Sequence, residues 1–223
     1  RDTPVNRLSI GIQSFHDKEL EWMNRAHNAD QAKRSLRLAQ KYGFEKLTAD
    51  LIYGLPGQTM KAWEDNIDTM LETGIGHISA YALTVEPRTA LGNWVKKGKV
   101  AIPPDEQVRE QFDLLIDKLA AAGLDQYEIS NFSRRGEMAV HNANYWKGLP
   151  YLGIGPSAHS FNTIEREWNE AHNIRYMEGM ESGNRPFEKE VLSERDKYNE
   201  LIMTRLRTSW GVDTRELARL GLH

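Results

Sequence analysis

Residues 47–59, LTADLIYGLPGQT, carry the pattern that decides the fold. The apolar run 47–55 predicts a strand, and Pro56-Gly57 predict a turn. Thr59 can cap a helix that continues to Gly74, where a glycine ends it. The sequence therefore predicts a strand, a tight turn and a helix in direct succession.

The same alternation extends in both directions along the chain. Residues 8–15 predict the preceding strand, and a helix capped by Asn28 is expected over residues 30–42. Residues 77–85 predict the strand that follows. Short connections make this βαβαβ arrangement parallel with right-handed crossovers. The prediction is an α/β protein whose strands form half a barrel or part of a doubly wound sheet.

The chain changes character after Pro103-Pro104. An amphipathic helix is predicted over residues 105–122, and residues 126–132 predict one short strand. Residues 133–170 have no sustained periodicity, so we expect a long loop that binds a ligand or covers a site. Further helices are expected near residues 173–179, 193–207 and 214–220.

The composition limits the chemistry. With 29 Lys and Arg against 32 Asp and Glu the net charge is −3, so no nucleic acid is expected as a partner. The chain has no cysteine, which excludes disulfides, thiolate zinc sites, cysteine nucleophiles and cysteine-ligated iron–sulfur clusters within it. No metal site of its own is expected. No window approaches 18 consecutive apolar residues and no signal-peptide pattern opens the chain, so a cytoplasmic protein is expected.

Polar residues lie near the carboxyl ends of the predicted strands, where α/β proteins hold their sites. Gln13 ends the first strand and Asp50 lies within the second, where its carboxylate either faces a polar barrel lumen or forms a buried ion pair. An amide and a carboxylate on neighbouring strands can hold a ribose diol. Arg25 can clamp a carboxylate, although a lone arginine more often forms a surface ion pair. The loop 54–59 can bind an anion, but a structural turn is favoured.

Residues 141–146, HNANYW, are the most distinctive segment. The imidazole of His141 can ligate haem iron, and Tyr145 and Trp146 offer flat surfaces to a planar macrocycle. The alternative is a loop packed by its own aromatic side chains, with His141 bonded to the backbone. A second imidazole, His159, lies in a glycine-rich stretch.

Seven segments together resemble one family. They are NRLSIGIQSF (6–15), NRAHN (24–28), DLIYGLPGQT (50–59), HISAYALTVEP (77–87), QYEISNF (126–132), HNANYW (141–146) and YLGIGPSAHS (151–160). They occur in the order seen in the oxygen-independent coproporphyrinogen III oxidase-like branch of radical SAM proteins. Within that branch, HNANYW and GIGPSAHS are similar to the haem-chaperone members rather than to the true oxidases.

The resemblance implies a fold and a division of the chain. The expected fold is the C-terminal half of a partial (β/α)6 radical SAM, TIM-like barrel, followed by a mostly helical C-terminal region. Residues 1–102 would be the second half of the barrel, with strands 4–6 of the family. Residues 103–192 would hold the barrel-closing helix, a strand and the HNxxYW region, and 193–223 the start of a truncated helical domain. The part with the cluster cysteines is missing, so we expect a fragment whose exposed strand edge makes it poorly soluble or dimeric.

The resemblance also implies cofactors: S-adenosylmethionine and a [4Fe–4S] cluster in full-length members, and haem. Gln13 and Asp50 would meet the ribose hydroxyls of S-adenosylmethionine, and Arg25 its methionyl carboxylate. Ala82 and Ile129 would line the adenosyl pocket. His141, with Tyr145 and Trp146, would bind haem. No catalytic residue is assigned.

Two functions follow from the resemblance. The first is a haem chaperone that passes haem to respiratory proteins, which leaves open an association with the membrane surface. The alternative is an oxygen-independent coproporphyrinogen III oxidase, which decarboxylates the substrate in porphyrin biosynthesis by means of a 5′-deoxyadenosyl radical. In either case this chain by itself is expected to be inactive as an enzyme, because it has no cluster cysteines.

Overall fold

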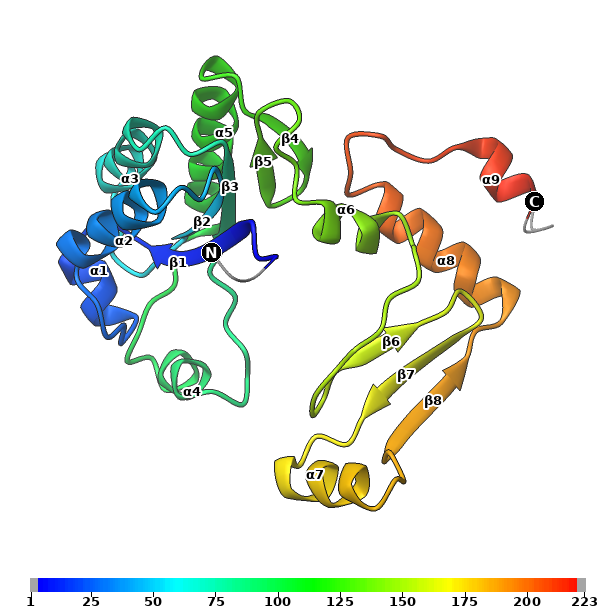
Figure 1. The fold of residues 1–223 in the computed structure, drawn as a ribbon. Helices are drawn as coiled ribbons and strands as arrows, with labels where there is room; N and C mark the ends of the chain where they lie inside the picture. The colour runs from blue at the N-terminus through cyan, green and yellow to red at the C-terminus, as the bar shows by residue number, and fades with distance from the viewer. Residues whose placement is uncertain (1–3, 220–223) are drawn as a thin grey trace. The chain divides into compact units, whose positions relative to one another are not determined.

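The structure, a computed structural model of the chain, describes residues 4–219 (Figure 1). The backbone divides into two compact units, residues 1–138 and 139–223, which we call the barrel unit and the C-terminal unit. The three-part division at residues 102 and 192 stays a prediction about the whole protein.

The barrel unit is built on three parallel strands, as the sequence predicts. They are β1 (Arg7–Gln13), β2 (Lys46–Tyr53) and β3 (His77–Ala82). Helices α1 (Asp17–Trp22) and α2 (Ala29–Lys41) join the first two strands, and α3 (Met60–Glu72) joins the second and third. In the parallel register Asp50 pairs with Ser79, so equivalent positions of neighbouring strands face the same side.

The predicted caps are confirmed. The side chain of Asn28 accepts from the N–H of Gln31, whose own side chain accepts from the N–H of Asn28, which makes a capping box at the start of α2. The Thr59 hydroxyl accepts from the N–H of Ala62 at the start of α3. Gly74 follows α3 with φ +71°, a left-handed conformation that a glycine adopts without strain.

The prediction of one strand over residues 126–132 is wrong. After α4 (Ala90–Lys96) and α5 (Asp105–Ala121) the chain forms a hairpin of β4 (Asp125–Glu128) and β5 (Asn131–Ser133). The Glu128 carboxylate stabilises the turn between these strands, because it accepts hydrogen bonds from the side chain of Asn131 and the N–H of Ser130. Strand β5 pairs antiparallel with β3, so the sheet order is β1-β2-β3-β5-β4.

The core of the barrel unit lies between this sheet and its helices. Trp63, Ile67 and Met70 of α3 and Leu115 and Leu119 of α5 are fully buried. They pack with alternate residues of β2 and β3, which leaves the intervening residues of those strands on the opposite face of the sheet.

The C-terminal unit is a three-stranded antiparallel sheet with helices. Its strands, in the order β6-β7-β8, are β6 (His159–Phe161), β7 (Glu165–Asn169) and β8 (Phe187–Val191). Its helices are α6 (Val140–Trp146), α7 (Asn173–Glu181), α8 (Glu194–Arg205) and α9 (Thr214–Arg219). The predicted end of the last helix, at residues 220 and 221, lies outside the described residues.

The expected long loop over residues 133–170 is therefore wrong as well, because it contains α6, β6 and β7. Apolar and polar residues alternate only weakly in the strands of this sheet, because ion pairs between neighbouring strands contribute to their stability. The Arg185 guanidinium pairs with the Glu167 carboxylate, and Lys189 Nζ lies 2.9 Å from Glu165 Oε1 across β7 and β8. Such cross-strand partners are set by register, which a linear pattern does not display.

Candidate functional site

The barrel unit presents a polar sheet face on the side away from its helices. Thr48 and Asp50 of β2 and His77 and Ser79 of β3 alternate with the core residues of those strands. We call this surface the polar face. It is held by its own hydrogen bonds, such as the one that Ser79 Oγ donates to Asn131 Oδ1 at 2.6 Å.

Asp50 lies at the centre of the polar face and is half-buried. Burial raises the pKa of its carboxyl group above the ordinary value, while hydrogen bonds from the hydroxyls of Ser79 and Ser9 act in the opposite direction. Of the two interpretations of Asp50, the structure supports a polar face, because among residues 4–219 the partners of the carboxylate are hydroxyls rather than a cation.

Gln13 and Arg25 lie close together over β1, the strand that pairs with the Asp50 strand β2. A Cβ atom built on Gly11 would lie 2.6 Å from Gln13 Nε2 and 3.6 Å from Arg25 Nη2, so the amide and the guanidinium meet over this glycine. Gln13 has φ +70°, a left-handed backbone that a glutamine rarely adopts. Arg25 is exposed, with its charge directed over β1.

Ala82 and Ile129 lie at the carboxyl end of β3 and in the hairpin next to it; along β3, Ala82 alternates with Ile78 and Ala80 rather than with Ser79. Ala82 ends β3 and is exposed, and Ile129 is 39% exposed in the turn between β4 and β5. The N–H of Ala80 donates to the carbonyl of Ser130 at 2.8 Å, which holds this turn against β3. All five residues predicted to contact S-adenosylmethionine are thus in the barrel unit, four of them on or beside its sheet strands and Arg25 in the loop after α1.

A buried polar cluster supports the corner where β1 ends, and sequence reasoning missed it. The Glu19 carboxylate accepts from Ser14 Oγ at 2.5 Å, from Asn66 Nδ2 at 3.0 Å and from Gln58 Nε2 at 3.1 Å. Gln58 and Gln111 both accept from the N–H of Gly54. These two side chains hold the first amide of the loop 54–59, and a structural turn stays the favoured interpretation of that loop. The sequence carries no specific signal for this cluster, because Asn66 and Gln111 lie in the middle of α3 and α5 and Gln58 lies in the turn before α3.

A second candidate site lies in the C-terminal unit, on α6. His141, Tyr145 and Trp146 belong to this helix, so the expected aromatic loop is a helix instead. His141 Nε2 lies 2.9 Å from the hydroxyl of Tyr145, and both side chains are exposed. The alternative in which His141 bonds to the backbone is therefore not what the structure shows.

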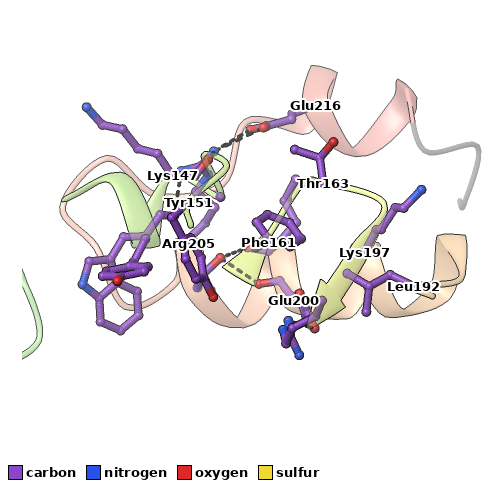
Figure 2. Close-up of a pocket in the computed structure, with 15 residues that line it drawn as sticks. Lys147, Tyr151, Phe161, Thr163, Leu192, Lys197, Glu200, Arg205 and Glu216 are labelled. Atoms are coloured by element: carbon purple, nitrogen blue, oxygen red, sulfur yellow. Dashed lines mark hydrogen bonds and ion pairs between the residues drawn. The ribbon is translucent and has the colours of Figure 1, made fainter. Parts of the chain in front are cut away.

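A pocket of about 360 Å³ opens beside Tyr145 and Trp146 (Figure 2). Its walls include the aromatic rings of Tyr151 and Phe161 and the side chain of Leu192. The rings of Tyr145 and Tyr151 meet edge to face, with centroids 4.6 Å apart. The pocket therefore offers flat apolar surfaces that α6 and the strand β6 supply together.

Charged groups complete the pocket. Arg166 Nη2 lies 2.6 Å from Glu200 Oε1, and Arg205 Nη2 lies 3.2 Å from Glu216 Oε1. Arg205 also donates to the carbonyl of Trp146 at 3.0 Å, which ties the end of α6 to α8. Glycine is required nearby at position 153, since a Cβ there would lie 2.2 Å from the carbonyl oxygen of His159.

Two general features bear on the ligand class. Among residues 4–219 no group of three or more His, Asp or Glu side chains is arranged as a metal site. Within the same residues, no helix has both the length and the apolar character that crossing a bilayer requires.

Comparison with known proteins shows what the chain is similar to. The radical SAM superfamily profile matches residues 1–70. The chain is 36% identical over 220 residues to "Heme chaperone HemW" of Bacillus subtilis, covering 98% of this chain and 58% of that protein. It is 35% identical over 222 residues to the protein of the same name from Mycobacterium tuberculosis, covering 99% and 56%. The chain thus spans little more than half the length of these relatives.

A solved structure shows the same fold. Coproporphyrinogen III oxidase (HemN) from Escherichia coli, a radical SAM enzyme, superposes with a TM-score of 0.78 over 98% of this chain and 54% of that one, at 20% identity. This match confirms the expected fold class, a partial TIM-like barrel followed by a further region. The chain therefore carries a radical SAM superfamily match over residues 1–70, shares the fold of HemN, and is similar over almost its whole length to proteins named heme chaperone HemW.

Proposed function

We propose that this protein is a haem chaperone of the HemW type, which binds haem and passes it to haem-accepting respiratory proteins. The observation that carries the proposal is the identity of 33–36% to relatives named heme chaperone, which extends over 95–99% of this chain and includes α6.

The haem site that we propose is α6 and the pocket beside it. Tyr145, Tyr151 and Phe161 supply aromatic surfaces that suit a planar macrocycle. Arg166 and Arg205 line the same pocket, and each would exchange its glutamate partner, Glu200 or Glu216, for a propionate carboxylate of haem. His141 stands one helical turn from Tyr145 and brings a ligand atom for iron to the same helix.

The S-adenosylmethionine site that we propose is the polar face of the barrel unit. Asp50 and Gln13 would hold the ribose diol, and Arg25 would pair with the methionyl carboxylate. Ala82 and Ile129 would border the adenosyl group, since both are exposed at this sheet. S-adenosylmethionine supplies a radical precursor in the family, but a cysteine-ligated [4Fe–4S] cluster does not fit the residues of this chain, which has no cysteine.

The alternative function, coproporphyrinogen III oxidation, has weaker support. It rests on the HemN structure, which is 20% identical to this chain and so speaks to the fold alone. The curated relatives that cover almost all of this chain are named heme chaperones instead.

The haem proposal is tested by titrating the purified protein with hemin and following the Soret band. We expect saturable binding to one site, with the affinity lowered about 10-fold in His141→Ala. His172→Asn is the matched control, because His172 is another exposed histidine of the C-terminal unit and asparagine keeps its place as a helix cap. If the unmodified protein, His141→Ala and His172→Asn all bind hemin with the same affinity, the proposed haem site on α6 is wrong. Absence of binding in the unmodified protein contradicts the chaperone and leaves the oxidase.

The S-adenosylmethionine proposal is tested by equilibrium binding of S-adenosylmethionine to Asp50→Asn. We expect the affinity to fall about 10-fold, because a hydrogen bond to a charged group contributes about 1.5 kcal/mol or more. Asp68→Asn is the control, since Asp68 pairs with Lys118 on the outer helices, away from the polar face. The same affinity in both variants contradicts the proposed contact.

A further inference from the structure

A row of four polar side chains crosses the polar face from strand to strand. In the strand register Asp50 of β2 pairs with Ser79 of β3, which pairs with Asn131 of β5. Asn131 pairs in turn with Glu128 of β4. Because paired positions of neighbouring strands point to the same face of a sheet, the four side chains stand next to one another, and we call them the Asp50 row.

Hydrogen bonds join the members of the Asp50 row. Asn131 Nδ2 donates to the Glu128 carboxylate, and Ser79 Oγ donates to Asn131 Oδ1 at 2.6 Å. The Ser79 hydroxyl is also a hydrogen-bond partner of the Asp50 carboxylate. Glu128, Asn131 and Ser79 are 3–5% exposed, whereas Asp50 is half-buried. The row therefore has a buried end at Glu128 and a partly exposed end at Asp50.

The buried end allows only one arrangement of these bonds. A carboxylate has acceptor atoms alone, so the Asn131 amide has to turn its Nδ2 toward Glu128 and its Oδ1 toward Ser79. An amide oxygen accepts but cannot donate, so Ser79 is the donor in the next bond and its hydroxyl has a fixed direction. The orientation of each group in the row is thus set by the group behind it.

Such an arrangement suits a site for vicinal hydroxyls. Two hydroxyls of one ribose reach both oxygens of a carboxylate only if the carboxylate has the right rotation. The Asp50 carboxylate is bonded by Ser79 of β3 on one side of β2 and by Ser9 of β1 on the other. A carboxylate that is held in this way before a ligand arrives loses less conformational entropy on binding than a free one.

We propose that Ser79, Asn131 and Glu128 are positioning residues that hold the Asp50 carboxylate for a ribose diol, so that the Asp50 row determines specificity for ribose over deoxyribose. Glu128 and Asn131 act through Ser79, and Ser79 acts through Asp50. The proposal rests on the S-adenosylmethionine site proposed above and names the residues that make its Asp50 contact specific.

Equilibrium dialysis of S-adenosylmethionine and of its 2′,3′-dideoxy analogue tests the proposal, because the two ligands differ only in the diol. We expect the unmodified protein to bind S-adenosylmethionine at least about 10-fold more tightly than the analogue. In Ser79→Ala the ratio of the two affinities is expected to fall to about 2-fold, because the row no longer reaches Asp50. A residue that only stabilises the fold would weaken both ligands alike, so an unchanged ratio in Ser79→Ala overturns the proposal.

A second variant tests the row beyond Ser79. Glu128→Gln keeps the shape of the side chain, but a glutamine both donates and accepts, so the Asn131 amide can take either orientation. We expect the ratio to fall about 3-fold in this variant, and an unchanged ratio overturns the role of Glu128. Ser133→Ala is the control, because Ser133 is a buried serine of β5 that pairs with His77 rather than with a member of the row, and it is expected to keep the ratio of the unmodified protein.

Asp50→Asn separates a failure of this proposal from a failure of the site. If the ratio is lost in Asp50→Asn and kept in Ser79→Ala, Asp50 contacts the diol and the role of the row is wrong. If the unmodified protein binds both ligands equally, or binds neither, the proposed contact between Asp50 and the ribose is wrong and the proposal about the row fails with it. Urea unfolding shows whether each variant is folded, and if Ser79→Ala is not, the isosteric Glu128→Gln decides.

Discussion

His77 at the start of β3 makes the stability of the barrel unit sensitive to pH. Its side chain is 1% exposed, and Nε2 lies 2.9 Å from the hydroxyl of Tyr127. Nδ1 is buried without a hydrogen-bond partner among the described residues. Burial, together with the nearby Arg7 guanidinium, lowers the pKa of His77 from 6.5 to about 4. The imidazole is therefore neutral in the folded protein near pH 7. Protonating it would place a positive charge in a buried position next to the Arg7 guanidinium, which is unfavourable.

The magnitude follows from linkage. The unfolded chain binds a proton at His77 below pH 6.5, and the folded protein does so only near pH 4, so stability is complete above pH 6.5 and is lost as the pH falls towards 4. Between pH 7.5 and pH 5 the two pKa values give a loss of about 2 kcal/mol from this residue. That is a large share of the stability of an ordinary domain.

The assay is urea unfolding of the unmodified protein and of His77→Gln at pH 7.5, 6 and 5. Glutamine does not titrate and can still bond to Tyr127, so this variant is expected to lose less stability than the unmodified protein between pH 7.5 and 5, by about 2 kcal/mol. A pH dependence that is the same in His77→Gln and in the unmodified protein refutes the reasoning.

Three further predictions concern single positions. Gln13→Gly is expected to raise the free energy of unfolding by about 1 kcal/mol relative to Gln13→Ala, because only glycine relieves the left-handed φ of +70°; equal stability of the two variants in urea contradicts this strain. Gly153→Ala is expected to destabilise the C-terminal unit by about 2 kcal/mol in thermal unfolding, because its Cβ meets the His159 carbonyl oxygen at 2.2 Å. An unchanged melting temperature would contradict this, because it would mean that the backbone around residue 153 accommodates the added methyl group without loss of stability. Strand β1 is an edge of its sheet, and we expect light scattering to show a homodimer paired there, which a monomer at high concentration would contradict.

The contrast between the two units shows how far sequence pattern reaches. Strands β1 to β3 and helices α2, α3 and α5 were predicted because each repeats an apolar period and ends at a cap or a glycine. Those signals are local, because the residues that give the apolar period and the residues that cap the element all lie within the same short segment. The segments that carry the family resemblance are also linear, so the resemblance could be recognised without coordinates.

The hairpin and the antiparallel sheet were not predicted, for a different reason. The turn at Ile129 and Ser130 depends on the Glu128 carboxylate, which accepts from two partners across the turn. Strand β8 is exposed along its whole length, so it has no apolar face for a pattern to reveal. Its pairing with β7 depends on register and on charges such as Lys189 and Glu165.

The candidate sites divide in the same way. The sequence by itself determined which residue types are available: Gln13, Arg25 and Asp50 in the barrel unit, and His141 and Tyr145 on α6. The partners of each group were decided only by tertiary structure, because Asp50 is bonded by hydroxyls from two other strands and Tyr145 reaches a pocket whose far wall comes from β6 and α8. The charge, exposure and hydrogen bonds of a side chain depend on residues distant in the chain, and these settle what the side chain can bind.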